Sequence, residues 1–127
     1  MGGCDHQRVP CSVLVVDDDS AFRDLAARIL TAWGLVVVGE AGSVADALDR
    51  AVQLHPDVAL VDIGLPDGDG FALTERLVAL PRSVRVVLIS SDADSVSARA
   101  AQRAGAQGFV GKDELSGQEL RRLLENA

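Results

Sequence analysis

Three acidic side chains follow directly on two short apolar runs. Asp17 and Asp18 come after residues 13–16, and Asp62 comes after residues 58–61. If both runs are parallel strands, the three carboxylates meet at the carboxyl-terminal edge of the sheet, where open α/β sheets bind ligands. Two unit charges about 4 Å apart interact by roughly 4 kcal/mol at an effective dielectric of about 20. The cluster therefore predicts a divalent cation, and an all-oxygen ligand set favours Mg²⁺, which typically accompanies a phosphoryl group.

Two further polar side chains follow later apolar runs. Ser90 comes after residues 84–89, and Lys112 stands just past residues 108–110. Right-handed crossovers place the ends of successive parallel strands on one rim, so the hydroxyl and the ammonium should arrive beside the acids. Carboxylates, a hydroxyl and an ammonium at equivalent strand ends contribute nothing to an apolar core. Their convergence indicates a functional site.

Apolar runs that alternate with segments of helical periodicity must position these side chains. A first helix is expected from a cap near Ser20 to Gly34, and a second helix is expected to be capped at Ser43. Further strands are expected at 35–38, 58–61, 84–89 and 108–110, further helices around 71–80, at 95–104 and at 115–124, and a loop at 64–70. Five strands, each followed by a helix, predict a doubly wound α/β fold of (βα)5 type. Nearly continuous apolar strands imply that helices cover both faces of the sheet.

Length and charge limit the classes of function. The 127 residues predict one folded domain, at 12–127, after a flexible lead-in at 1–11. A net charge of −7 argues against direct contact with nucleic acid or an anionic membrane, and favours a protein partner. No apolar run approaches the roughly 20 residues of a membrane span, and the start has no apolar signal core. The expected location is the cytoplasm.

The chain resembles the receiver domains of bacterial response regulators, the phosphoacceptor half of two-component signalling. Four motifs between residues 12 and 125 carry the resemblance: Val15–Ser20, Val61–Pro66 with Gly70, Leu88–Ser91 and Ala104–Lys112. The resemblance implies a flavodoxin-like (CheY-like) five-stranded sheet with strand order 2-1-3-4-5. Asp113 replaces the Pro that often follows the lysine. At this position and at residues 37–41, the sequence is similar to that of receivers that carry a LuxR-type helix-turn-helix output domain.

The same resemblance implies a phosphoacceptor and a metal site. Asp62 is expected to attack a phosphoryl group and form an acyl phosphate. Asp18, Asp62 and the backbone carbonyl of Gly64 are expected to bind Mg²⁺, with Asp17 acting mainly through water. The implied activity is signalling rather than enzymatic, limited to the domain's own phosphorylation and slow dephosphorylation.

The resemblance also implies a switch and partners. Lys112 is expected to hold a phosphoryl oxygen, and Ser90 is expected to donate a hydrogen bond to another. Ser90 and the aromatic Phe109 are expected to move together as a bistable packing element. The expected partners are a sensor histidine kinase and, through the charged helix faces, a second copy of the chain. DNA would be bound only through an output domain.

Two alternatives compete with this interpretation. A hydrolase of the haloacid dehalogenase type would use Asp17 as nucleophile, Asp19 as general acid, and Ser90 and Lys112 to bind phosphate. That alternative leaves Asp62 unexplained, and its motif is broken at residue 21. A receiver-like module that takes no phosphate and acts only by binding is the second alternative.

Three more acids in loops receive interpretations. Asp67 and Asp69 are interpreted as turn residues, because a calcium loop that began at Asp67 would need an oxygen ligand where Phe71 stands. In receiver domains the positions of Gly64 and Asp92 flank the path of the water that hydrolyses the acyl phosphate. The resemblance therefore implies that Asp92 positions this water.

Overall fold

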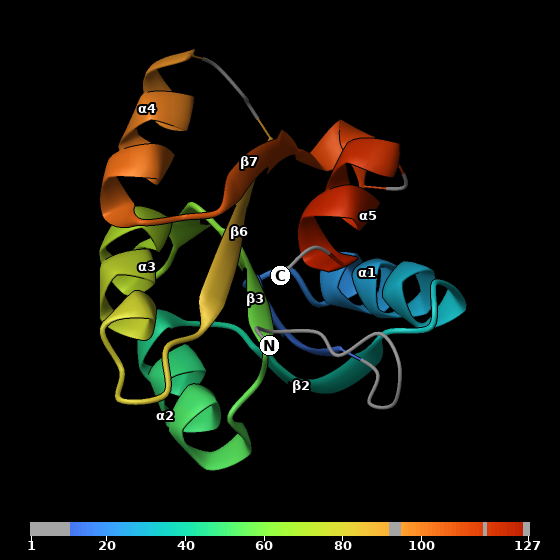
Figure 1. Ribbon diagram of the computed structural model, residues 1–127, viewed down its shortest axis with the longest axis horizontal. Helices are drawn as coiled ribbons and strands as arrows, with labels where there is room; N and C mark the ends of the chain where they lie inside the picture. Colours follow the sequence, from blue (N-terminus) through green and yellow to red (C-terminus); the bar gives the residue numbers. More distant parts are fainter. Residues whose placement is uncertain (1–10, 92–94, 116, 126–127) are drawn as a thin grey trace.

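The computed structural model describes residues 11–91, 95–115 and 117–125, and five parallel strands form its main sheet (Figure 1). In chain order the elements are β1 (Ser12–Val16), α1 (Ser20–Ala32), β2 (Val36–Ala41), α2 (Val44–Leu54), β3 (Val58–Asp62), β4 (Gly64–Leu65), β5 (Gly68–Asp69), α3 (Gly70–Val78), β6 (Arg85–Ser90), α4 (Ser95–Ala104), β7 (Gly108–Gly111), a 3₁₀ turn (Lys112–Glu114) and α5 (Gln118–Glu125). The sheet order is β2-β1-β3-β6-β7. This order is the expected 2-1-3-4-5 arrangement of a CheY-like fold.

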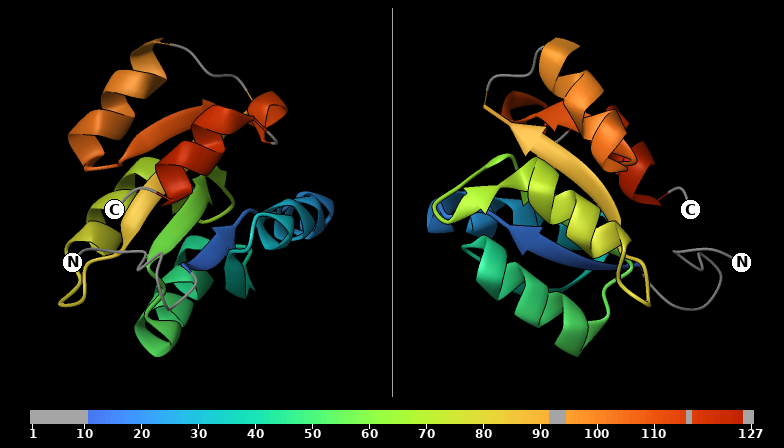
Figure 2. Two further views of the ribbon diagram at one scale, coloured as in Figure 1. Left: turned by 45° about the vertical axis from the view of Figure 1, so that its right-hand side comes forward. Right: turned by 90° about the vertical axis from the view of Figure 1, so that its left-hand side faces the viewer.

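Helices cover both faces of the sheet, as the apolar strands predict. Helices α1 and α5 lie on one face, and α2, α3 and α4 lie on the other (Figures 1 and 2). All five residues of β3 are buried, and alternate side chains of the central strands enter the two cores. Strand β3 is therefore the rigid centre from which Asp62 projects.

Local side chains fix the starts of the helices. Ser43 caps α2 as expected, because its hydroxyl accepts the N–H of Asp46 at 3.1 Å. The cap of α1 is Asp19 rather than Ser20, because the Asp19 carboxylate accepts the N–H of Ala21 at 3.0 Å. This contact sets the first turn of α1 directly beside the acid pair.

Several element bounds differ from the sequence prediction. Strand β2 continues to Ala41, since it pairs with β1 to its end and its last carbonyl accepts the N–H of Asp17 at 2.9 Å. The expected loop at 64–70 contains a small antiparallel hairpin of β4 and β5. The last helix starts at Gln118 instead of 115, because residues 112–114 first form a 3₁₀ turn.

Asp67 does more than make a turn. Its two carboxylate oxygens accept the N–H groups of Val44 at 2.7 Å and Ala45 at 3.1 Å, at the start of α2. These backbone hydrogen bonds lower the pKa of Asp67 below its ordinary value. The segment that follows Asp62 is thus tied to the helix across the sheet edge.

Within the described ranges, no helix is both long enough and apolar enough to cross a bilayer.

Candidate functional site

The three acids meet at the carboxyl-terminal edge of the sheet. Asp17 directly follows β1, and Asp62 is the last residue of the neighbouring strand β3. Asp17, Asp18 and Asp62 each offer a carboxylate oxygen, and these oxygens lie within 4.8 Å of one another. Asp17 is fully buried and Asp62 is only 8% exposed, whereas Asp18 is exposed. The cluster is thus open to solvent on the Asp18 side.

Lys112 enters the same cluster from the turn that follows β7. Its Nζ lies 2.6 Å from Oδ2 of Asp17 and 3.8 Å from Oδ2 of Asp62. Burial acts to lower the pKa of Lys112, but the hydrogen bond with Asp17 and the charges of Asp62 and Asp17 outweigh it. The net result is a pKa above the ordinary value, so Lys112 stays charged.

The electrostatic environment of Asp62 is unfavourable for a carboxylate. Its pKa is raised, first because burial penalises the charged form and then because Asp17 repels it. The charge of Lys112 and a hydrogen bond from the backbone N–H of Gly64 oppose that rise only in part. A cation at the cluster would relieve the remaining penalty.

The donor set fits Mg²⁺. The three carboxylates are hard oxygen ligands, and the exposure of Asp18 leaves room for the waters that this ion retains. Asp17, Asp18 and Asp62 are the residues that would hold it. The N–H of Gly64 already donates to Asp62, and the expected ligation by the Gly64 carbonyl stays a prediction.

Two neighbours of the acid pair were not anticipated from the sequence. Arg23 donates from Nη1 to the backbone carbonyl of Asp17 at 2.6 Å and pairs through Nε with Glu40 at 3.1 Å. The ring of Phe22 lies below the ammonium of Lys112, with 4.4 Å between Nζ and the ring centroid. The available signal was their position in the first turn of the helix that follows the acids. In the sequence, an apolar residue of a helical stripe followed by an arginine gives no sign of these contacts.

Ser90 and Phe109 lie in the paired strands β6 and β7, and their role as a switch stays a prediction. Ser90 ends β6, is 4% exposed and stands opposite Gly111 in the β6–β7 pairing. Phe109 lies in β7, is half-buried and packs against the core beneath α2, α3 and α4. Asp92, the expected water-positioning residue, lies outside the described residues.

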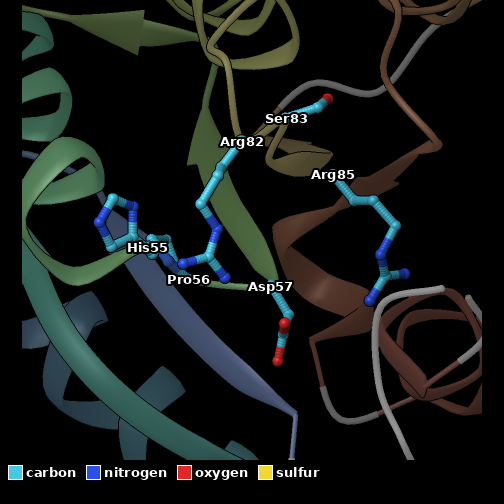
Figure 3. A pocket seen from close by; sticks show the side chains of 6 residues that line it. All are labelled: His55, Pro56, Asp57, Arg82, Ser83 and Arg85. Atoms are coloured by element: carbon cyan, nitrogen blue, oxygen red, sulfur yellow. The ribbon is translucent and has the colours of Figure 1, made fainter. Parts of the chain in front are cut away.

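A hollow of about 120 Å³ lies at the opposite edge of the sheet, where β3 and β6 begin (Figure 3). Two of its charged residues, Asp57 and Arg85, already serve the fold. Asp57 accepts hydrogen bonds from the N–H and hydroxyl of Ser12 at 2.9 and 3.1 Å, and Arg85 donates to Gln107 at 3.2 Å. The lining consists of His55, Pro56, Asp57, Arg82, Ser83 and Arg85. None of the predicted site residues belongs to it.

The fold and the site together define the class of CheY-like signalling domains. Carboxylates, a hydroxyl and an ammonium converge at the strand ends of a doubly wound sheet with order 2-1-3-4-5. The sequence profile of the response regulator receiver domain matches residues 13–125. The chain belongs to the family of response regulator receiver domains.

Similarity to individual proteins agrees with this assignment. The chain is 39% identical over 115 residues to the DNA-binding transcriptional activator DevR/DosR of Mycobacterium tuberculosis, covering 90% of this chain and 52% of that protein. The receiver domain of the response regulator NarL from the same organism superposes with a TM-score of 0.80 at 34% identity, covering 90% of this chain and 96% of that chain. The structure of a Burkholderia pseudomallei response regulator with a phosphorylated aspartic acid and a calcium ion superposes with a TM-score of 0.80 at 25% identity. The match covers 90% of this chain and 66% of that chain. The chain spans about half the length of the first two relatives that it matches.

The hydrolase alternative finds no support. The matched family is the receiver domain over nearly the whole chain. Asp19, which a hydrolase would use as general acid, has its carboxylate engaged as the cap of α1. Asp62, which that alternative left unexplained, is one of the three acids of the cluster.

Proposed function

We propose that this chain is the phosphoacceptor domain of a two-component response regulator, and that Asp62 accepts a phosphoryl group from a sensor histidine kinase. One observation carries the proposal. Asp62 is the cluster acid that ends the central buried strand, and it faces both the acid pair and Lys112. The Burkholderia pseudomallei protein, with its phosphorylated aspartic acid, supports it by analogy.

The residues suggest a simple in-line transfer. A carboxylate oxygen of Asp62 attacks phosphorus, the bond between phosphorus and the donor breaks, and the donor leaves with the electron pair of that bond. Mg²⁺, when bound, supplies positive charge that offsets the carboxylates and the phosphoryl oxygens. Lys112 then shifts from Asp17 toward a phosphoryl oxygen. Asp17 stays in place because its Oδ1 accepts the N–H of Asp19 at 2.9 Å.

The response to phosphorylation involves Ser90 and Phe109. The Ser90 hydroxyl donates a hydrogen bond to a phosphoryl oxygen and moves toward Asp62. The half-buried ring of Phe109 follows into the space beside β6, because both side chains sit on adjacent, paired strands. This movement changes the surface formed by α4 and β7, and thereby signals to an output.

The output that we propose is transcription, exerted in the cytoplasm. The similarity to DevR/DosR over about half of that activator's length supports an output domain in the whole protein that contacts DNA. The net charge of −7 argues against direct contact of the receiver domain itself with DNA. Pairing of two copies through the charged faces of α4 and α5 is a further part of the proposal.

Intact-mass measurement after treatment with acetyl phosphate and Mg²⁺ tests the acceptor. The wild type should gain one phosphoryl group, and Asp62→Asn should gain none. Asp49→Asn, an exposed acid on α2, serves as the matched control and should behave as the wild type. Equal phosphorylation of Asp62→Asn and the wild type would refute the assignment and direct attention to Asp17.

A further inference from the structure

The Lys112 ammonium is held between an aromatic ring and the acid cluster. Phe22, in the first turn of α1, places its ring centroid 4.4 Å from Nζ. On the other side, Nζ contacts Asp17 at 2.6 Å and approaches Asp62 to 3.8 Å. Only 21% of the surface of the Lys112 side chain is exposed to solvent. Ring and carboxylates together therefore replace much of the water around this cation.

The negative face of an aromatic ring attracts a cation within about 6 Å of its centroid, and the attraction grows as the cation is desolvated. A lysine side chain is a point charge on a flexible four-carbon stem, so without such a contact it samples positions in solvent. Asp17 alone could hold the ammonium, but only by the ion pair that must loosen when a phosphoryl group arrives. The ring contact needs no such exchange.

We propose that Phe22 is a positioning residue for Lys112: its ring keeps the ammonium at the cluster while the hydrogen bond passes from Asp17 to an oxygen of the phosphoryl group on Asp62. This inference rests on the proposed function. No covalent bond of Phe22 or Lys112 forms or breaks in this step, and the proton stays on Nζ throughout. The ring raises the fraction of molecules in which Lys112 is poised to meet the phosphoryl oxygens.

A purely structural role for Phe22 makes different predictions. The half-buried ring also packs against the core that α1 and α5 cover. A leucine at this position would preserve much of that apolar contact and lose the π face. A tyrosine would preserve both. Comparison of the two variants therefore separates cation binding from packing.

The first experiment reads the contact directly, in the metal-free protein. A ring whose face lies against the end of the lysine side chain should shift the NMR resonances of the Lys112 methylene next to Nζ upfield. We expect this shift in the wild type and in Phe22→Tyr, and its loss in Phe22→Leu. Identical lysine shifts in the wild type and Phe22→Leu would overturn the inference.

The second experiment measures the rate of Asp62 phosphorylation by acetyl phosphate with Mg²⁺, together with the affinity for beryllofluoride, a mimic of the phosphoryl group. Phe22→Leu should lose roughly 2- to 30-fold in both, the range expected for a cation–π contact between exposed and desolvated limits. Phe22→Tyr should stay within about twofold of the wild type. Arg121→Gln is the matched control. It removes the corresponding contact with Trp33, the other aromatic residue of this region, and should leave both quantities unchanged.

A double-mutant cycle completes the test. In a Lys112→Met background, Phe22→Leu should cause no additional loss, because the partner of the ring is gone. An equal loss in both backgrounds would assign Phe22 to packing alone and overturn the inference. If the wild type took no phosphoryl group at all, the proposed function would fail and this role with it. If the wild type were phosphorylated and Phe22→Leu were phosphorylated equally fast, only the positioning role of Phe22 would be refuted.

Discussion

Lys112 pairs closely with Asp17, at 2.6 Å, and stands 3.8 Å from the proposed acceptor Asp62. Asp17 is the fully buried member of the cluster, so its charge has the greatest need of a partner. The lysine thus balances a buried acid in this arrangement and remains within a short movement of Asp62. One ammonium can therefore serve both the fold and the phosphorylated state.

Lys112→Met should separate phosphorylation from the response. The variant should still gain some phosphate on Asp62, more slowly than the wild type, while the change in backbone NMR shifts around Phe109 should be absent. The variant should also unfold more easily, by roughly 1–3 kcal/mol in urea, because Asp17 loses its charged partner. A full phosphorylation-dependent shift change around Phe109 in Lys112→Met would show that the lysine has no role in switching.

The raised pKa of Asp62 predicts a pH dependence of stability in metal-free protein. The native state binds this proton more tightly than the unfolded state, whose value is near 3.8. Stability should therefore decrease as pH rises from that value through the higher native pKa. Asp62→Asn should remove this contribution and raise the free energy of unfolding at pH 7 by on the order of 1 kcal/mol. Urea denaturation over a pH series measures both. A variant that is less stable than the wild type at pH 7 would contradict the electrostatic account.

Addition of Mg²⁺ should stabilise the wild type, because the ion would bind the native cluster and would find no such site in the unfolded chain. At a concentration about 100 times the dissociation constant, the gain is about 2.7 kcal/mol. Asp18→Asn should lose most of this gain, since Asp18 is the exposed acid at the open side of the cluster. Thermal unfolding with Mg²⁺ or with EDTA provides the measurement, with Asp49→Asn as control. If Mg²⁺ stabilised Asp18→Asn as much as the wild type, Asp18 would not belong to the metal site.

Asp67 should stabilise the start of α2 through its two backbone hydrogen bonds. Asp67→Ala should speed amide hydrogen exchange at Val44 and Ala45. Because the pKa of Asp67 is lowered, its contribution is present above the ordinary value of 3.8 and is lost as pH falls through the lower native value. Unchanged exchange at these two amides would mean that Ser43 alone caps the helix. Asp69→Ala, which removes the cap of α3, is the control and should leave α2 unaffected.

Sequence patterns predicted the sheet, its order through the family resemblance, and the convergence of Asp17, Asp62 and Ser90 at one edge. Apolar runs of strand length and helical stripes are local patterns, and parallel strands with right-handed crossovers bring their ends together whatever the details of packing. Three contacts became visible only in the folded chain: Lys112 pairs more closely with Asp17 than with Asp62, Phe22 underlies the ammonium, and Asp67 caps a helix that begins 23 residues earlier. These contacts join segments distant in the chain and depend on the rotamer of each side chain and the space left by its neighbours, which local sequence patterns do not encode.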